Sequence, residues 1–354
     1  MTILHICGVQ NKMSNGATVA VIEHVNAQSK TGLADIEVLH VRDEKLSFDE
    51  AVQVVKMEQA KMAIAQADLL VFHELYYISF ISLASYAKRV GTPYIVIPHG
   101  ALTVGAQTPK KCAKIVVNGL WARSYIEKAA AVQFLSNSEK ETSLKWNYKS
   151  FIAPNGVSLP ADMKVYNTQY AGLKLVFIGR LNLFHKGLDA LVDACDLIRD
   201  EMLSRNIRLD IYGPIDGDNG GELVKLVSDK SLQDVVSIHD SVFGRDKMQA
   251  MMDADVFIQT SRFEGMPMGL LGAMAAGLPL IVTPGTNFDQ AVEDNDCGWI
   301  CQTDAGSIAH AIIEAADDKI SWPIKSINAR EFVKNNFEWS RVASDTISKY
   351  KEYV

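Results

Sequence analysis

Two basic residues, Arg180 and Lys186, flank a short loop between an expected strand and an expected helix. Free backbone N–H groups and the helix dipole make such a helix N-terminus a favourable place for an anion. Two cations over the same spot suit a diphosphate, because a guanidinium binds phosphate oxygens in pairs and an ammonium adds a point charge. The same pattern also fits a surface arginine and a helix-start lysine that are only solvated or paired.

A carboxylate, Glu264, stands between glycine-rich and proline-containing sequence in the loop 263–267. This loop follows an expected strand (255–259) and precedes an expected helix (268–276). A glutamate at this position can simply satisfy the helix dipole. Its place at the carboxyl end of a strand, beside Gly265 and Pro267, favours a hydrogen-bond acceptor for ligand hydroxyls.

Further candidates follow strands of the first half of the chain. Gly16 begins the first helix, where a glycine lets a phosphate or an acceptor approach the backbone, and Asn15 can act there as the N-cap. No GxGxxG sequence is present, which argues against a nicotinamide enzyme. His99 follows the expected strand 94–98 and lies at the carboxyl edge of its sheet. Ser138 and Glu141 form an S-x-x-E capping box, which explains both as helix-start residues.

Short apolar, β-branched runs alternate with helix-period segments along the whole chain, which predicts parallel sheets with right-handed crossovers. The expected strands are 3–7, 35–41, 69–73, 94–98, 131–135, 151–153, 173–179, 209–212, 235–238, 256–259, 280–282 and 298–301. The expected helices include 17–28, 49–67, 111–128, 187–199, 245–252, 268–276 and 305–316.

The polar stretch 157–172 interrupts this rhythm after the turn sequence 154–156, and we interpret it as a linker. It divides the chain into an N-terminal domain (1–157) and a C-terminal domain (158–337). The aromatic-rich segment 338–354 is expected to pack as a helix on a domain already built. Two doubly wound domains joined in this way are expected to bind ligands at the carboxyl ends of their strands, across a cleft.

Composition narrows the function classes. The chain has 354 residues, 48% of them hydrophobic, and a formal net charge of −7. That charge argues against general nucleic-acid binding, which needs a broad positive surface. Five cysteines without a CxxC pair indicate reduced, buried thiols and no zinc site. The N-terminus is typical of a first strand and not of an export signal, so we expect a cytoplasmic protein.

Taken together and in order, these motifs resemble those of the family-4 retaining glycosyltransferases of the GT-B fold, which are common in bacterial surface-polysaccharide assembly. The residues that carry the resemblance are Pro98-His99-Gly100, 136–139, 154–157, Gly179-Arg180-Leu181 with Lys186-Gly187, 261–267 and 275–279. The resemblance implies an α/β protein with two Rossmann-like domains. The N-terminal domain would bind the acceptor, and the C-terminal domain would bind a nucleotide sugar.

The resemblance also implies roles for individual residues. Arg180 and Lys186 would bind the donor diphosphate, His99 would contact the transferred sugar and stabilise developing charge, and Glu264 would bind the sugar hydroxyls. The remaining donor-site residues would be Gly16, Gly265, Met266, Pro267 and Met268, with Tyr212, Gly213, Ser241 and Val242 at the base pocket. Asn15, Gly16 and Ser138 would lie on the acceptor side. Such enzymes use no metal or other cofactor, and a UDP-sugar is favoured over a GDP-sugar as the co-substrate.

One position departs from the family pattern. The family carries a second glutamate eight residues after the first, where it accepts hydrogen bonds from the nucleotide ribose, and here that position is Gly272. If the ribose docks nearby, Gly272→Glu is expected to tighten nucleotide binding. If another group occupies that space, binding is expected to weaken. Two other functions therefore stay open: a non-catalytic GT-B partner of an active enzyme, and a sugar-nucleotide epimerase that needs no acceptor.

The segment 109–128 combines lysines and an arginine with aliphatic residues and Trp121. This mixture suits the headgroup region of a membrane and a polyprenyl-linked or saccharide acceptor, so we expect peripheral contact with the inner face of the cell membrane. A core-packed helix with a solvated basic side is the alternative.

Overall fold

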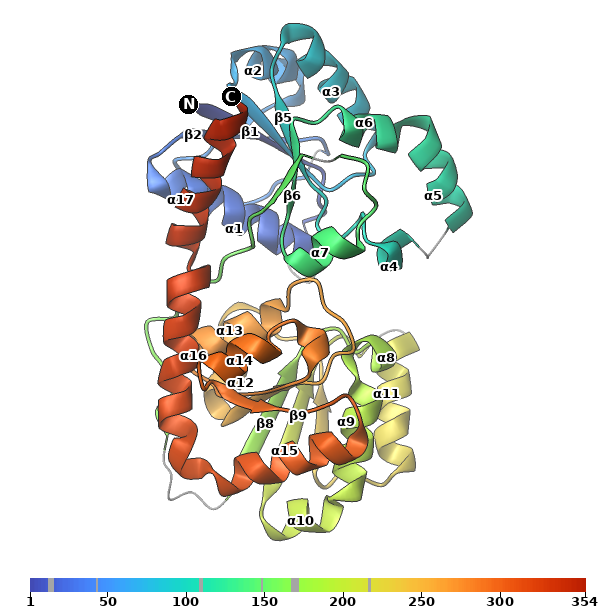
Figure 1. Cartoon of the computed structure of the whole chain (residues 1–354), viewed down its shortest axis with the longest axis vertical. Helices are drawn as coiled ribbons and strands as arrows, with labels where there is room; N and C mark the ends of the chain where they lie inside the picture. The colour runs from blue at the N-terminus through green and yellow to red at the C-terminus, as the bar shows by residue number, and fades with distance from the viewer. Residues whose placement is uncertain (12–15, 43, 108–110, 148, 167–171, 216–217) are drawn as a thin grey trace. The chain divides into compact units, whose positions relative to one another are not determined.

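A computed structural model describes the chain except for residues 12–15, 43, 108–110, 148, 167–171 and 216–217 (Figure 1). The chain divides into two compact units. Unit 1 comprises Met1–Gly156 and Trp339–Val354, and unit 2 comprises Val157–Glu338. The boundaries expected from the sequence each lie one residue away from these.

Unit 1 is built on a parallel sheet whose strands are ordered β3-β2-β1-β4-β5-β6-β7 in the part of the chain that is described. Their bounds are β1 (Thr2–Cys7), β2 (Asp35–His40), β3 (Gln53–Val55), β4 (Leu69–His73), β5 (Tyr94–Ile97), β6 (Ala131–Phe134) and β7 (Ser150–Ile152). Every residue of β4, β5 and β6 is buried, as expected for strands covered on both faces.

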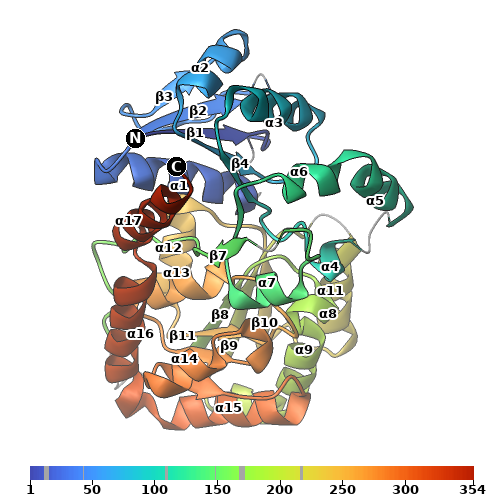
Figure 2. The same cartoon turned by 45° about the horizontal axis from the view of Figure 1, so that its top comes forward.

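Helices cover both faces of this sheet (Figure 2). Their bounds are α1 (Gly16–Thr31), η1 (Met57–Gln59), α2 (Ala60–Gln66), α3 (Ile78–Val90), α4 (Val104–Gln107), α5 (Lys111–Val117), the π-helix η2 (Asn118–Ala122), α6 (Arg123–Glu127), α7 (Asn137–Thr142), α17 (Trp339–Tyr350) and η5 (Lys351–Tyr353). The helix expected over 49–67 is wrong in its first half, because Gln53–Val55 pairs with β2 and extends the sheet. Pairing with a distant strand overrides local helical periodicity there.

Unit 2 repeats the architecture with the strand order β10-β9-β8-β11-β12-β13 among its described residues. The strands are β8 (Leu173–Ile178), β9 (Ile207–Tyr212), β10 (Val236–His239), β11 (Val256–Gln259), β12 (Leu280–Val282) and β13 (Gly298–Ile300). The helices are α8 (Leu183–Lys186), α9 (Leu188–Leu197), α10 (Arg199–Ser204), α11 (Asp218–Asp229), α12 (Gly244–Asp253), α13 (Met268–Ala276), η3 (Pro284–Thr286), α14 (Asp289–Asp294), α15 (Ala305–Asp317), η4 (Lys319–Ser321) and α16 (Trp322–Phe337).

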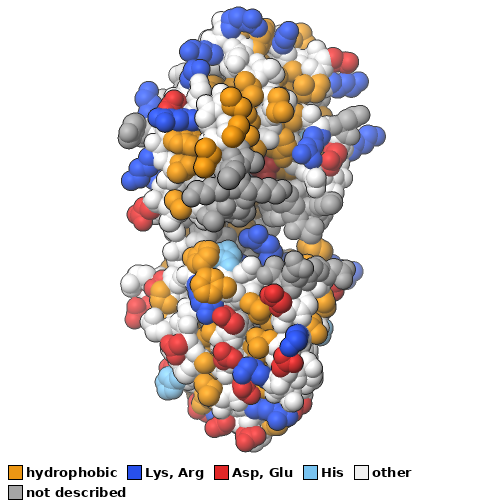
Figure 3. Space-filling model, turned by 90° about the vertical axis from the view of Figure 1, so that its right-hand side faces the viewer, with side chains coloured by type: hydrophobic (Ala, Val, Ile, Leu, Met, Phe, Trp, Pro, Cys, Tyr) orange, Lys and Arg blue, Asp and Glu red, His pale blue; other side chains and the backbone are white. Residues whose placement is uncertain are grey.

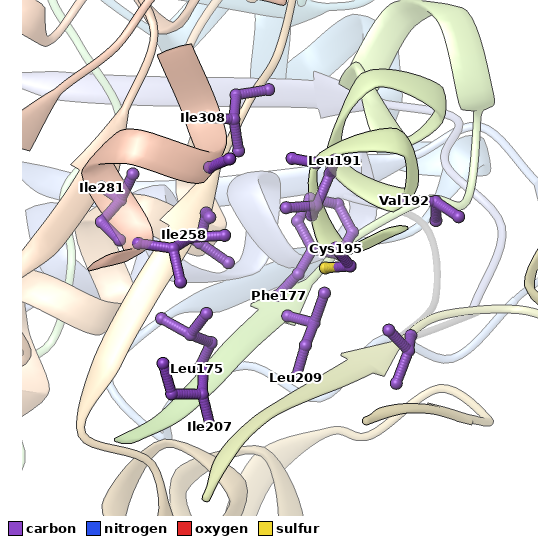
Figure 4. Packing of buried hydrophobic residues seen from close by; sticks show 14 of the residues in the cluster. Leu175, Phe177, Leu191, Val192, Cys195, Ile207, Leu209, Ile258, Ile281 and Ile308 are labelled. Carbon is purple, nitrogen blue, oxygen red and sulfur yellow. The ribbon is translucent and has the colours of Figure 1, made fainter. Parts of the chain in front are cut away.

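Apolar cores lie on both faces of each sheet. Figure 4 shows one core of unit 2, where Leu175, Phe177 and Leu209 from the sheet meet Leu191 and Cys195 of α9. A second core of unit 2 buries most of α13 against α16. In unit 1, two separate apolar clusters form the cores on the two faces of the sheet. The loops that follow the carboxyl ends of the strands are therefore attached to tightly packed and rigid sheets.

The C-terminal helix belongs to unit 1, although the chain reaches it only after completing unit 2. α17 packs on α1, and Tyr350 is fully buried against the sheet of unit 1. Figure 2 shows α17 beside α1. A buried tyrosine needs a hydrogen-bond partner for its hydroxyl, and Tyr350 donates to Gln133 Oε1 at 2.7 Å.

Four cysteines (Cys7, Cys195, Cys297 and Cys301) are buried and unbridged. In the described part of the chain, no three or more His, Cys, Asp and Glu side chains are grouped so that they could hold a metal ion. None of the described helices is both long and apolar enough to span a membrane.

Candidate functional site

The carboxyl ends of three neighbouring strands in unit 2 bring predicted segments together. Gly179 follows β8, Gly213 follows β9, and Ser241 follows β10 by two residues. The Gly179 N–H donates to the Tyr212 carbonyl at 3.0 Å. A Cβ atom at Gly213 would lie 2.2 Å from the Gly179 carbonyl oxygen, so only glycine allows this approach. The loops after these strands therefore lie at one edge of the sheet.

A single helical turn, α8, carries Lys186 to this edge. It begins after Asn182, whose side-chain oxygen accepts the His185 N–H at 2.7 Å. It ends at Gly187, which has a left-handed φ of 63°. A Cβ atom at Gly187 would lie 2.0 Å from the carbonyl oxygen of Thr260. Glycine is thus required at 187 for the turn to rest on the end of β11.

Lys186 and Glu264 form an ion pair, with 2.5 Å between Nζ and Oε1. Their side chains are only 11% and 7% exposed. The same carboxylate oxygen accepts hydrogen bonds from Gln259 Nε2 at 2.9 Å and from Ser261 Oγ at 2.7 Å. Asn287 holds the backbone of this loop by donating to the Glu264 carbonyl. A cation suited to phosphate and an acceptor suited to hydroxyls therefore meet at one point.

Arg262 holds the Glu264 loop in place. Its guanidinium donates two hydrogen bonds to the Asp189 carboxylate, at 2.7 and 2.9 Å, and a third to the Phe184 carbonyl. It also stacks over the Phe184 ring, 4.5 Å from the ring centroid. This arginine therefore ties the end of β11 to α8 and α9, a role that the sequence did not reveal.

Arg180 is exposed and makes no ion pair with any acidic residue that the structure describes. Burial lowers the pKa of the neighbouring His185, and the positive charges of Lys186 and Arg180 lower it further, against the opposing effect of Glu264. Arg180 is left available for an anionic ligand.

The loop after Glu264 leads into α13 with little covering it. Gly265 is exposed, and a Cβ atom added there would meet nothing within 4 Å. Pro267 occupies the N-cap position and provides no capping side chain for the N–H groups of the first turn. The Met268 N–H donates to the Met266 carbonyl at 3.0 Å. Most of α13 beyond this turn is buried, which fixes its N-terminus in place.

Tyr212 forms part of an aromatic platform at the other end of the same edge. Its ring stacks on His239, with centroids 4.5 Å apart and planes inclined by 19°. His239 in turn lies 2.6 Å from a carboxylate oxygen of Asp210. Ser241 and Val242, predicted for the base pocket, follow β10 directly and are partly buried. His239 and Asp210 were not predicted, because neither belongs to a motif.

A lysine occupies the surroundings of Gly272. An ideal Cβ atom at this position would lie 3.4 Å from Met251 Cε and 3.6 Å from Lys247 Nζ. The Lys247 ammonium group makes no hydrogen bond or ion pair with a described residue, and burial lowers the pKa of Lys247. A glutamate at 272 would therefore lie beside the Met251 methyl group and the Lys247 ammonium group, which changes the expectation for Gly272→Glu.

In unit 1, His99 and Gly100 form a tight turn after β5, with φ angles of 49° and 82°. Glu139 holds this turn. Its two carboxylate oxygens accept the N–H groups of Gly100 and Leu135, both at 2.6 Å. Burial raises the pKa of Glu139, and these two hydrogen bonds oppose the rise. Glu139 therefore positions His99, a role that its place in the motif 136–139 did not reveal.

The capping box expected at Ser138 and Glu141 is wrong. The N-cap of α7 is Ser136, whose hydroxyl accepts the Glu139 N–H at 3.0 Å. The sequence contains S-x-x-E in both registers, and the contact of Glu139 with Gly100 favours the earlier one. Ser138 consequently lies within the first turn of the helix and is partly buried.

The last two acceptor-side predictions fall at the start of α1. Gly16 is the first residue of the helix and is exposed, and a Cβ atom there would meet nothing within 4 Å. Asn15 lies outside the described residues. The predicted residues thus gather at the carboxyl edges of two separate sheets, within unit 1 and within unit 2.

Comparison with known proteins identifies the part of the chain that carries the densest set of these features. Residues 172–318 match the family described as Glycosyl transferases group 1. This segment is similar to a glycosyltransferase group 1 domain. It includes the Lys186–Glu264 pair, Arg180, Gly272 and the Tyr212 platform.

Relatives and solved structures extend the likeness beyond that domain. The chain is 24% identical over 320 residues to D-inositol 3-phosphate glycosyltransferase of Pseudarthrobacter chlorophenolicus, covering 85% of this chain and 75% of the relative. It is 26% identical over 269 residues to an Escherichia coli UDP-Gal:alpha-D-GlcNAc-diphosphoundecaprenol alpha-1,3-galactosyltransferase, covering 71% of this chain and 67% of the relative. HepE of Anabaena, solved with UDP and glucose, superposes with a TM-score of 0.72 at 15% identity, covering 99% and 100% of the two chains.

These likenesses and the two parallel sheets establish the fold as GT-B, an α/β architecture with two Rossmann-like units. The domain match and the relatives together support a glycosyltransferase. The likeness to HepE, at 15% identity, speaks for the fold alone.

Proposed function

We propose that this protein is a retaining, metal-independent family-4 glycosyltransferase that moves a hexose-type sugar from a nucleotide-diphosphate sugar to a saccharide or lipid-linked acceptor in cell-surface polysaccharide biosynthesis. The observation that carries the proposal is the Lys186–Glu264 pair, with only 11% and 7% of the side chains exposed. It brings a phosphate-binding cation and a hydroxyl acceptor to one point of the glycosyltransferase domain.

The chemistry of the pair fits the two halves of a nucleotide sugar. Lys186 and the exposed Arg180 would bind the diphosphate and stabilise the charge that develops on it as the sugar leaves, in the place that a metal ion takes in other transferases. The second oxygen of Glu264, which has no hydrogen-bond partner among the described residues, would accept hydrogen bonds from sugar hydroxyls. The N–H groups of Gly265 and of the first turn of α13, which Pro267 does not cap, would add donors for phosphate or sugar oxygens.

The nucleoside would lie toward Tyr212, whose stacked pair with His239 offers an aromatic surface beside Ser241 and Val242. A UDP-sugar is the favoured donor, because the galactosyltransferase of Escherichia coli carries UDP-Gal in its name. That relative also has a diphosphoundecaprenol acceptor in its name, which supports a lipid-linked acceptor here.

Turnover of nucleotide sugars tests this function. The purified full-length chain is incubated with a panel of UDP- and GDP-sugars, with and without a polyprenyl-diphosphate sugar, and release of nucleoside diphosphate is measured. We expect release that requires both substrates, survives a metal chelator, and gives a product with the donor's anomeric configuration. Acceptor-independent conversion of the nucleotide sugar would instead support an epimerase, and no conversion of any donor would support a non-catalytic partner.

The lipid-linked acceptor would be met through a basic and apolar surface of unit 1. From Leu75 to Lys128 the sequence has seven Lys and Arg residues and one acidic residue, Glu127. Ile115, Val116 and Leu120 of α5 and η2 are each more than half exposed. Figure 3 shows Lys and Arg side chains around hydrophobic ones on a face of unit 1, in its upper part. Such a mixture suits an anionic membrane surface.

A pocket in this surface strengthens the membrane proposal. Lys88 of α3 and Lys128 line it together with Leu120 and Trp121. Tyr125 also lines it, and the Tyr125 hydroxyl is buried without a hydrogen-bond partner among the described residues. Two ammonium groups and a tryptophan around a small pocket are typical of headgroup contact.

Vesicle flotation tests membrane contact. Neutral vesicles and vesicles with about a third anionic lipid are compared at low salt. We expect binding only to the anionic vesicles, and Leu120→Glu should weaken it strongly. Ile320→Glu is the matched control, because Ile320 is 87% exposed but lies in unit 2. Equal loss in both variants, or no binding by the wild type, would contradict peripheral contact through this surface.

A further inference from the structure

A carboxylate that the sequence analysis did not single out follows the central strand β4 of unit 1. Glu74 comes directly after His73, the last residue of β4. Its φ angle is 73°, in the left-handed region that residues with a side chain seldom adopt. His99, which follows the neighbouring strand β5, has a φ angle of 49°. Strained residues of this kind cluster at binding and active sites, and here two of them follow adjacent strands at one edge of the sheet.

Glu74 also lies at the point where the strand order of the sheet reverses. From β1 the chain continues outward to β2 and β3 on one side, and then returns to place β4 and the later strands on the other side. β1 and β4 are hydrogen-bonded neighbours, so the loops after them start side by side and lead toward opposite halves of the sheet. Ligands of open parallel sheets bind outside the carboxyl ends of the strands at such a reversal.

Unit 2 has its own reversal between β8 and β11, and its site residues follow those two strands. Arg180 and Lys186 come after β8, and Glu264 comes after β11. Unit 1 places Gly8 after β1 and Glu74 after β4, which hold the corresponding places in the strand order. Each sheet thus carries a glutamate in the loop after the equivalent strand.

Tyr77 holds one oxygen of the Glu74 carboxylate. The Tyr77 hydroxyl donates to Glu74 Oε2 at 2.5 Å. The Tyr77 ring packs directly on the backbone after β1: a Cβ atom at Gly8 would lie 2.7 Å from Tyr77 Cε1, so glycine leaves the room that the ring needs. The Arg42 guanidinium lies over the ring, 5.3 Å from its centroid. Gly8 and Arg42 thus fix the ring whose hydroxyl orients Glu74.

The other oxygen of Glu74 is open to a ligand. Oε1 has no hydrogen-bond partner among the residues that the structure describes, and the Glu74 side chain is partly exposed. Burial raises the pKa of Glu74, and the Tyr77 hydrogen bond and the positive charge of Arg42 oppose the rise. A carboxylate oxygen accepts hydrogen bonds, so its partner must be a donor. The guanidinium close by disfavours a cationic ligand, and hydroxyl groups are the donors that suit this place.

We propose that Glu74 binds the acceptor of glycosyl transfer, and that its carboxylate accepts a hydrogen bond from a hydroxyl group of the acceptor sugar. This role rests on the proposed function. The donor-site residues Lys186 and Glu264 belong to unit 2, so the reversal point of unit 1 is left for the second substrate. Tyr77 is a positioning residue, because it acts on the acceptor only through Glu74.

Thermal unfolding of the full-length chain separates a ligand-binding side chain from one that only holds the loop. Asparagine adopts a left-handed φ more readily than glutamate, so Glu74→Asn should keep the melting temperature of the wild type or raise it. Glu139→Gln is the matched control, because Glu139 accepts two backbone N–H groups and its loss should lower the melting temperature. A fall for Glu74→Asn as large as that for Glu139→Gln would assign Glu74 a structural role and overturn the proposal.

Binding of simple sugars tests the site without turnover. Saturation-transfer magnetic resonance of the full-length chain is measured with methyl glucoside, methyl galactoside and methyl N-acetylglucosaminide in the presence of UDP. We expect transfer to at least one of these sugars in the wild type and in the control Glu352→Gln, which changes an exposed glutamate of η5, and loss of that transfer in Glu74→Gln. No transfer from the wild type to any of the sugars, or equal transfer from Glu74→Gln, would overturn the proposal.

Steady-state kinetics separates this proposal from the proposed function. Glu74→Gln should raise KM for the acceptor at least about tenfold, the value of one hydrogen bond to a charged group, and change KM for the donor less than about twofold. Tyr77→Phe keeps the ring beside Gly8 and should raise KM for the acceptor about fivefold. Unchanged KM for the acceptor in both variants would overturn the role of Glu74 and leave the glycosyltransferase intact. Absence of transfer by the wild type would instead overturn the proposed function, and the sugar-binding result would then decide on Glu74.

Discussion

The Lys186–Glu264 pair should contribute measurably to stability even without a ligand. Because the two side chains are only 11% and 7% exposed, Lys186→Met leaves a nearly buried carboxylate with only the donors of Gln259 and Ser261. Breaking a buried pair costs about 3–5 kcal/mol, and the two remaining hydrogen bonds reduce this to about 2–3 kcal/mol. In a unit of this size that loss lowers the melting temperature by about 4–12 °C.

Chemical unfolding of the full-length chain measures this effect as a double-mutant cycle of Lys186→Met and Glu264→Gln. The double variant should recover at least about 1.5 kcal/mol relative to the sum of the single variants. Lys225→Met is the control: Lys225 pairs with Asp229 over the same 2.5 Å, but the side chains are 75% and 59% exposed, so we expect a loss below about 0.5 kcal/mol. Equal losses for Lys186→Met and Lys225→Met, or an additive cycle, would refute the reasoning.

Three further predictions follow from the geometry. In Gly272→Glu the new carboxylate should pair with Lys247, so this variant should be about 1 kcal/mol more stable than Gly272→Gln. Calorimetry should show no tighter binding of UDP. Tighter UDP binding with unchanged stability would contradict this pairing. Lowering the pH from 7.5 to 5 should destabilise unit 1. The pKa of His5 is about 4 in the folded chain and about 6.5 in the unfolded chain, so the unfolded state takes up a proton first as the pH falls. The control His310→Gln, at an exposed position, should leave the pH dependence of stability unchanged. Arg262→Met should lower the free energy of unfolding by about 1 kcal/mol. Arg199→Met, which breaks the more exposed pair with Asp234, should lower it less. Equal losses would argue that Arg262 does not hold the Glu264 loop.

The alternation of apolar strands and amphipathic helices was sufficient to predict both sheets. Strands such as Leu69–His73 and Val256–Gln259 are buried on both faces, so their composition alone distinguishes them from their surroundings. β3 was missed because Gln53 and Val54 lie exposed at the edge of the sheet, where only pairing with β2 defines the strand. The register of the α7 cap was missed for a similar reason, since a contact with Gly100 selects it.

Site residues that belong to a sequence motif could be predicted, whereas contacts between segments far apart in the sequence could not. Lys186, Glu264 and His99 stand in recognisable sequences at strand ends. Glu139 stands in the motif 136–139, but its contact with Gly100 joins segments far apart along the chain, and so does the approach of Lys247 to Gly272.

The most direct test of the account is calorimetric titration of the full-length chain with UDP. We expect the wild type to bind, Lys186→Met to bind at least about tenfold more weakly because a charge-assisted phosphate contact is lost, and the exposed-pair control Lys225→Met to bind like the wild type. Equal affinity of the wild type and Lys186→Met for UDP would contradict the assignment of the Lys186–Glu264 pair to the donor diphosphate.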